Sequence, residues 1–133
     1  ILAQVVEVQV GNDGRLTIKR ITSALDCGQM ITPDGVTAQE QGATLFGLTA
    51  ALYGNITFKD GRVVQSNFHD YQILRMNEVP PMDIHLISNH EKPGGMGEIG
   101  TTLVAPALVN AIHAATGTRL RKLPIDTELL KLT

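Results

Sequence analysis

Apolar and polar residues alternate with a period of two near the start of the chain. The alternating apolar positions are Val6, Val8, Val10, Leu16 and Ile18. This period is typical of strands with one buried face, and a Gly-Asn-Asp-Gly segment between the two runs indicates a turn. The pattern therefore predicts an antiparallel hairpin whose second strand continues towards residue 25. The alternation slips near Arg20 and Ile21, which predicts a β-bulge there.

A helix is predicted over residues 32–53. Thr32-Pro33-Asp34 combines a hydroxyl residue that can cap a helix, a proline suited to the first turn and an acid near the positive end of the helix dipole. We expect Gly54 to end the helix in a left-handed conformation. The residues expected to share its apolar face are Val36, Ala43, Phe46 and Ala50. Its glycines each cost about 1 kcal/mol of helix propensity relative to alanine, so another segment is expected to approach its backbone closely.

The second half of the chain begins with another hairpin signal. Asp60-Gly61 suits a two-residue turn with positive φ at both positions. Apolar residues over 84–87 then predict one more strand. Apolar side chains recur at helical spacing over 103–116, with Pro106 expected in the first turn of that helix and Gly117 at its end.

The order hairpin, helix, hairpin, strand, helix indicates an α+β fold, with antiparallel hairpins packed against two main helices. Leu120, Leu123 and Ile125 are expected to pack back as a last strand or extended segment. With 133 residues, 43% of them hydrophobic and 18% charged, the chain fits a single domain over residues 1–133. The first residue is not methionine, so we interpret the chain as part of a longer protein.

Composition excludes several classes of protein. A net charge of −2 with scattered basic residues argues against a nucleic-acid partner. The single cysteine, Cys27, excludes an intramolecular disulfide and a multi-cysteine metal cage. No apolar run approaches the roughly 20 residues of a membrane helix, which predicts a soluble chain. The four histidines lack the spacing of a metal site, so no metal ligand is assigned.

The segment before the second helix is rich in glycine and contains one acid. Its glycines are Gly94, Gly95, Gly97 and Gly100. We expect them to allow positive φ and close approach of a ligand to the backbone, and a helix start favours anions. The match to the dinucleotide fingerprint G-x-G-x-x-G lacks the required strand-helix-strand context. Glu98 is either a general base aimed into a cavity or an acid placed to favour the helix dipole.

Several phrases together resemble a known family. They are Asp26-Cys27-Gly28, Thr32-Pro33-Asp34, Gln39 with Gly42, Phe46-Gly47-Leu48, and Gly95-Met96-Gly97-Glu98 followed by Ala105-Pro106-Ala107. In order and spacing they resemble the C-terminal end of the molybdenum-binding large subunit of the xanthine oxidase family. Residues 74–80 and 116–125 look most like the isoquinoline 1-oxidoreductase beta-subunit branch, which includes bacterial aldehyde dehydrogenase-type hydroxylases. The resemblance covers nearly the whole chain.

The resemblance implies an oxidoreductase with water as the source of oxygen and an aldehyde or N-heteroaromatic compound as substrate. It implies that Glu98 is the active-site base and that Gln39 and Gly97 contact the cofactor. That cofactor would be molybdopterin, in its cytosine dinucleotide form, with molybdenum. The implied partners are upstream segments of the same subunit and an iron–sulfur small subunit.

Without those partners, the isolated chain is expected to be cofactor-free and inactive. Relatives of this bacterial branch are often periplasmic, but the residues indicate neither the periplasm nor the cytoplasm. A reading from a different class stays open, in which the loop from Gly94 to Gly100 makes the chain a stand-alone α+β anion- or ligand-binding module.

Overall fold

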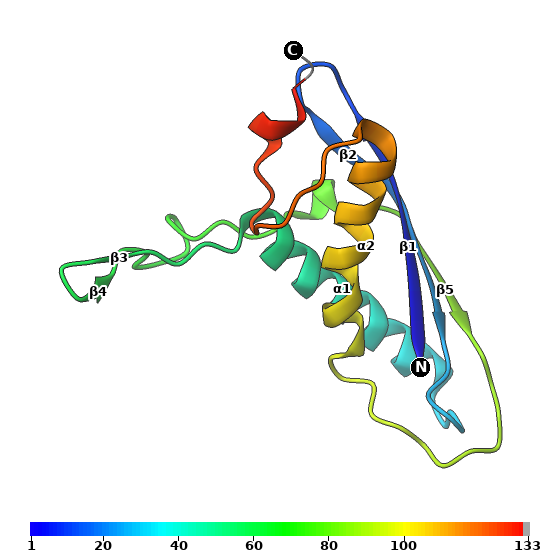
Figure 1. Cartoon of the computed structure of the whole chain (residues 1–133). Helices are drawn as coiled ribbons and strands as arrows, with labels where there is room; N and C mark the ends of the chain where they lie inside the picture. The colour runs from blue at the N-terminus through cyan, green and yellow to red at the C-terminus, as the bar shows by residue number, and fades with distance from the viewer. Residues whose placement is uncertain (132–133) are drawn as a thin grey trace.

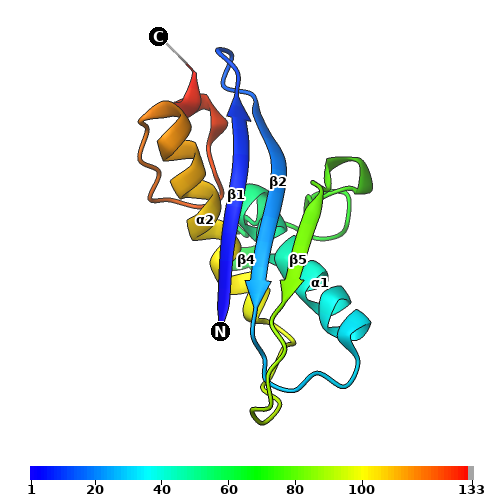
Figure 2. The ribbon, with the colours of Figure 1, turned by 90° about the vertical axis from the view of Figure 1, so that its right-hand side faces the viewer.

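A computed structural model of the chain, which describes residues 1–131, contains a three-stranded sheet with two helices on one face (Figure 1). The sheet order is β1-β2-β5, and Figure 2 shows this sheet in front of both helices. The larger elements are β1 (Leu2–Val10), β2 (Leu16–Leu25), α1 (Pro33–Tyr53), β5 (Met82–Leu86) and α2 (Ile99–Thr116). The shorter ones are β3 (Phe58–Lys59), β4 (Arg62–Val63) and the 3-10 helices η1 (Met76–Glu78) and η2 (Thr127–Leu130).

The predicted first hairpin and its bulge are both confirmed. β1 and β2 are antiparallel, and the register shifts where Glu7 faces Arg20 but Val8 faces Ile18. Lys19 is therefore the extra residue. The insertion returns Ile21 to the core, where it is fully buried, because each added residue reverses the side of the sheet that later side chains face.

The α+β class is confirmed, but the hairpin description misses the direction of the third strand. β5 pairs in parallel with β2, with Ile21 opposite Met82 and Leu25 opposite Leu86. A parallel pair requires a long crossover, and α1 with the segment after it supplies that connection. Because the two strands are parallel, the end of β5 lies beside the end of β2. The chain segments that follow these two strand ends both lead towards the glycine-rich loop.

The first helix occupies the predicted residues and begins at Thr32-Pro33-Asp34 as predicted, but the capping hydrogen bond and the left-handed end are absent. Thr32 is the N-cap residue, yet its hydroxyl makes no capping hydrogen bond. Gly54 has φ −63°, so it does not end the helix in the left-handed conformation. Glycine is needed at position 54 for space, because a Cβ would lie 2.9 Å from the Ala50 backbone.

Of the predicted apolar face of α1, only Ala43 is buried. Phe46 is 73% exposed. The buried residues are Glu40, Ala43, Thr44, Gly47, Leu48 and Ala51. Small residues are selected here because α2 crosses α1 closely: a Cβ on Gly47 would lie 2.6 Å from the Thr101 carbonyl oxygen and 2.7 Å from Val104 Cγ1. The expected close approach to the α1 backbone is therefore confirmed at Gly47.

The second helix supplies much of the core. Val104, Leu108 and Ile112 are fully buried in a cluster with residues of β1, β2 and α1. Gly117 ends α2 with φ 75°, as predicted, whereas Pro106 lies inside the helix rather than in its first turn. The sequence interpretation expected no apolar run close to the length of a membrane helix, but α2 is long and apolar enough to cross a membrane by length and composition. Its buried stripe packs against β1 and α1.

The segment after α2 returns to the core without forming a strand. Leu120 and Ile125 are buried, and the Ile125 amide donates a 2.8 Å hydrogen bond to the Ala51 carbonyl. Leu123 is half exposed, so only two of the three predicted contacts form. This hydrogen bond joins the returning segment to the C-terminal end of α1.

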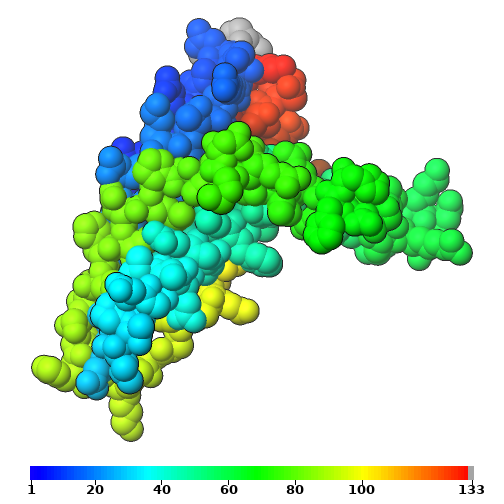
Figure 3. Space-filling model, turned by 180° about the vertical axis from the view of Figure 1, so that it is seen from behind, coloured from blue at the N-terminus to red at the C-terminus, as the bar shows by residue number. Residues whose placement is uncertain are grey.

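Between α1 and η1 the chain forms a thin projection, residues 55–75, here called the arm (Figures 1 and 3). β3 and β4 pair within it, and the predicted turn is confirmed because Asp60 has φ 51° and Gly61 has φ 73°. At the base of the arm the Tyr53 hydroxyl donates to Glu78 Oε1 at 2.5 Å. Burial and this hydrogen bond raise the pKa of Tyr53 to about 12.

A turn in the arm is expected to be lost at low pH. The Asp70 carboxylate accepts hydrogen bonds from the amides of Asn67 and Ser66 and from the Ser66 hydroxyl, which lower the pKa of Asp70 from 3.8 to about 2. Because the folded pKa is below the unfolded one, the stabilisation is complete above about pH 4 and disappears as the pH falls through about 2. NMR shifts of the Ser66 and Asn67 amides should titrate with a midpoint near 2, and Asp70→Asn should abolish this titration. A midpoint near 4 would contradict the assignment.

Candidate active site

A groove of about 450 Å³ lies between α1 and the start of α2. Its lining residues are Gly42, Ala43, Phe46, Gly97, Glu98, Thr101 and Thr102. One wall is thus a face of α1, and the other is the end of the glycine-rich loop with the first turn of α2. The crossing at Gly47 holds the two walls together, because α1 has no side chain there and α2 packs directly on its backbone through the Thr101 carbonyl and the Val104 side chain.

Glu98 lies at the N-cap position of α2 and lines the groove. Its side chain is exposed and makes no capping hydrogen bond, and across residues 1–131 it has no hydrogen-bond or ion-pair partner. A residue selected as a helix cap would accept a bond from the amide two or three positions ahead. The carboxylate is therefore free to meet a ligand in a concave part of the surface.

Gln39 is exposed on α1, close to the groove but not among its lining residues. It precedes Gly42 by three residues and Phe46 by seven, so the three lie along one face of the helix. The structure thus places Gln39 about one helical turn beyond the α1 wall. Gly97 contributes bare backbone to the opposite wall.

The loop glycines do not have the predicted positive φ. In the described residues, positive-φ glycines occur only at Gly14, Gly28, Gly61 and Gly117. Lack of space explains Gly100 but not Gly95 or Gly97. A Cβ on Gly100 would lie 2.7 Å from Glu40 Oε2, whereas one on Gly95 or Gly97 would meet nothing within 4 Å. Bare backbone therefore faces open space on the groove side, and tight packing lies behind it.

Behind the groove lies a buried polar cluster that the sequence reasoning did not find. Gln4 Nε2 lies 3.0 Å from Glu40 Oε1, 2.8 Å from Thr44 Oγ1 and 3.1 Å from Ser23 Oγ. Glu40, Thr44 and Ser23 are fully buried, and Glu40 Oε2 has no hydrogen-bond partner among the described residues. Sequence periodicity gives no signal for a buried acid in a helix, so only the packing reveals this cluster.

The Asp26-Cys27-Gly28 phrase anchors the glycine-rich loop. The Asp26 carboxylate accepts from the Gly28 amide at 3.0 Å and from Asn89 Nδ2 at 2.7 and 2.8 Å. The Gly94 amide donates to the Cys27 carbonyl at 2.7 Å, and the Gln29 amide to the Glu91 carbonyl at 2.9 Å. The end of β2 therefore holds the segment that leads to Gly97 and Glu98. An Asp followed two residues later by Gly is a turn signal that could have predicted the local part of this arrangement.

The residues at the groove suit a flat polar ligand with a hydrogen-bonding edge. Gly42 and Gly97 both line the groove without side chains, and added Cβ atoms there would meet nothing within 4 Å. The Gln39 amide, which can donate and accept, makes no side-chain hydrogen bond in the described part of the chain. These features fit the pterin part of a molybdenum cofactor. No group of three or more His, Cys, Asp or Glu in residues 1–131 is placed to hold a metal ion by itself.

The amino-acid sequence matches a known family over its first part. Residues 1–80 match the model of the molybdopterin cofactor-binding domain. The chain is 43% identical over 112 residues to "Membrane-bound aldehyde dehydrogenase [pyrroloquinoline-quinone]" of Gluconacetobacter polyoxogenes, covering 84% of this chain and 14% of the relative. It is 35% identical over 121 residues to "Isoquinoline 1-oxidoreductase subunit beta" of Brevundimonas diminuta, covering 91% of this chain and 16% of the relative.

Solved structures show the same fold. Quinoline 2-oxidoreductase from Pseudomonas putida 86 superposes with a TM-score of 0.77 at 24% identity, covering 86% of this chain and 16% of the other. The sequence match identifies a cofactor-binding domain, and the solved structure shares its fold. The chain belongs to the molybdopterin cofactor-binding domain family found in the molybdenum-binding subunits of xanthine oxidase-type enzymes. It spans about 14–16% of the length of the two relatives described above.

Proposed function

We propose that this chain is the part of a molybdenum hydroxylase large subunit that supplies the general base and one edge of the cofactor site. The complete enzyme would oxidise an aldehyde or an N-heteroaromatic compound with oxygen from water. The observation that carries the proposal is the groove, which presents an unpartnered Glu98 carboxylate opposite bare α1 backbone at Gly42. Membership of the family gives this geometry its chemical context.

Each proposed role follows from the contacts of the residue. The Glu98 carboxylate has no competing donor within residues 1–131, so it can accept a proton from a group bound in the groove. The anchored loop restricts the backbone that leads to Glu98, and a restricted position favours a general base. Gln39 and the Gly97 backbone would hold the polar edge of the pterin. When bound, the molybdenum cofactor would supply the two-electron redox chemistry that no side chain of this chain can provide.

The cofactor itself is a direct test of the proposal. One relative carries a quinone in its name, whereas the family model describes molybdopterin binding. Metal analysis of the complete enzyme should therefore find molybdenum, and extraction should yield a pterin, in our proposal the cytosine dinucleotide form. A complete enzyme that contains pyrroloquinoline quinone and no molybdenum would refute the proposed function.

Gln39 is expected to affect retention of the cofactor rather than folding. Each lost hydrogen bond costs roughly 1 kcal/mol, so Gln39→Ala in the complete enzyme should weaken retention by roughly threefold to tenfold. The measurement is molybdenum content after prolonged buffer exchange. Gln41→Ala is the matched control, because it lies on the same helix but about 200° around its axis from Gln39. Equal molybdenum loss in both variants would contradict the role of Gln39.

Other parts of the complete enzyme are included in the proposal. Since this chain supplies only part of one groove, the remaining cofactor contacts and the substrate pocket would come from other segments of the large subunit. An iron–sulfur small subunit would carry the electrons away. The isolated chain is accordingly expected to be inactive and free of cofactor.

A further inference from the structure

The arm carries large apolar side chains that the described residues leave uncovered. They are Ile56, Phe58, Val63, Val64, Phe68 and Ile73, and exposed Met76 follows at the start of η1. Phe68 is 87% exposed and Met76 is 90% exposed. Apolar side chains that gather in one exposed patch mark sites of contact, and Ile56, Phe68 and Tyr71 gather around one recess. The arm projects away from both layers of the domain, so the two helices and the sheet cannot cover it (Figures 1 and 3).

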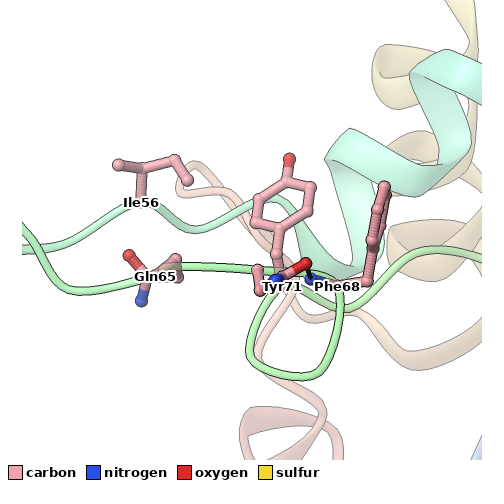
Figure 4. A pocket seen from close by; sticks show the side chains of 5 residues that line it. Ile56, Gln65, Phe68 and Tyr71 are labelled. Carbon is pink, nitrogen blue, oxygen red and sulfur yellow. Dashed lines mark hydrogen bonds between the residues drawn. The ribbon is translucent and has the colours of Figure 1, made fainter.

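The arm has no core that would explain its shape. β3 and β4 contain two residues each, and a two-stranded hairpin is at best marginally stable alone. A recess of about 260 Å³ is nevertheless formed along it by Ile56, Gln65, Asn67, Phe68 and Tyr71. Figure 4 shows Ile56, Phe68 and Tyr71 pointing to the same side of the arm. The Asp70 carboxylate accepts hydrogen bonds from the amides of Ser66 and Asn67, the two residues before Phe68. This turn holds Phe68 in the arrangement.

We propose that the apolar side of the arm docks against the remainder of the same large subunit, with the recess receiving an apolar side chain from it. The proposal rests on the proposed function to the extent that the chain is part of such a subunit. A match covering 91% of this chain must include the arm, which lies more than 50 positions from either end, and that match covers only 16% of the relative. The arm thus belongs to the stretch shared with a polypeptide about six times as long.

The chemistry of the surface favours this occupant over a separate protein. Permanent interfaces resemble a domain core cut in half, whereas interfaces between proteins that associate transiently are more polar. An apolar arm that waited for another molecule would also expose an aggregation-prone surface. A segment of the same polypeptide is present at high effective concentration from synthesis onwards and covers the surface at once.

Hydroxyl-radical footprinting of the complete large subunit, without cofactor and without its partner subunit, tests the proposal. The modification rates of Phe68 and Met76 in the folded subunit are expected to be roughly tenfold below those in the denaturant-unfolded subunit, because docking removes both side chains from solvent. Met96, which is 7% exposed, is the internal reference and should be protected in the folded subunit whether or not the arm docks. No molybdenum is needed, so failure of the proposed function would leave this measurement unaffected.

Three results would overturn the proposal. Phe68 and Met76 could react as fast as in the unfolded subunit, which would show a free arm. Protection that appears only with the iron–sulfur subunit would assign the surface to that partner, and protection that rises with protein concentration would assign it to a second copy. Phe68→Ser is expected to lower the thermal midpoint of the complete subunit, whereas Arg62→Ser, exposed at the polar tip of the arm, should not; equal midpoints for both variants would also contradict docking.

Discussion

Glu98→Gln in the complete, cofactor-loaded enzyme is expected to lower kcat by roughly 10²- to 10⁴-fold, the usual contribution of a general base. The substitution keeps the size and hydrogen-bonding edge of the side chain but removes its ability to accept a proton. Because Glu98 is exposed and has no partner in residues 1–131, the change should leave folding within about 0.5 kcal/mol of the original. Turnover and molybdenum content are measured on the same preparation.

Glu91→Gln is the matched control for this experiment. Glu91 lies seven positions earlier on the same loop, is exposed, and does not line the groove. It should keep full turnover, because only its backbone takes part in holding the loop. If Glu98→Gln retains turnover with full molybdenum content, Glu98 is not the base. If it loses molybdenum as well, its role is in binding.

Gly28→Ala is expected to destabilise the chain by roughly 2–5 kcal/mol, from two causes that add. Gly28 has φ 79°, a conformation in which an L side chain is strained. Its added Cβ would also overlap the Lys92 carbonyl oxygen and lie 3.0 Å from the Glu91 carbonyl oxygen. The overlap pushes away the segment that the Asp26-Cys27-Gly28 phrase anchors. The free energy of unfolding of the complete subunit, measured by chemical denaturation, is expected to fall. The kcat of the loaded enzyme is expected to fall as well.

Gly117→Ala separates the two causes. Gly117 has φ 75°, almost the same conformation as Gly28, but an added Cβ there meets nothing within 4 Å. This variant should lose only the conformational part, roughly 1–2 kcal/mol, and keep its turnover. Equal destabilisation by the two substitutions would show that contact between Gly28 and the loop contributes nothing.

Local patterns predicted the elements well where each residue's own preference decides the conformation. The β1–β2 hairpin, its bulge at Lys19, the Asp60-Gly61 turn and the end of α2 at Gly117 all follow from period and turn chemistry. The failures occur where a distant segment decides. The parallel pairing of β5 with β2 and the burial of small residues of α1 against α2 are two such cases. Gly54 is an exception, because the contact that limits space there is with Ala50, only four residues away.

The candidate site shows the same division. Glu98 was a candidate base from its place in the glycine-rich loop, and the resemblance to a family supported that role and added Gln39 and Gly97. The roles of all three remain predictions. The groove that brings Glu98 close to the face of Gln39 could not be predicted, because residues 59 positions apart meet only through the crossing of α1 and α2. Most of the expected apolar face of α1 failed for the same reason. Close helix packing favours Gly47 and Ala43 over the larger Phe46.

By itself the sequence determined which segments are strands, helices and turns, and which family phrases the chain contains, because those properties depend on neighbours along the chain. Only the tertiary structure decided that β5 pairs in parallel with β2, that Asp26 binds Asn89 beneath the glycine-rich loop, and that Glu40 is buried behind Gly100. It also decided that the arm stands apart with its apolar side uncovered. These are contacts between residues far apart in sequence, whose energy depends on packing that no local pattern encodes.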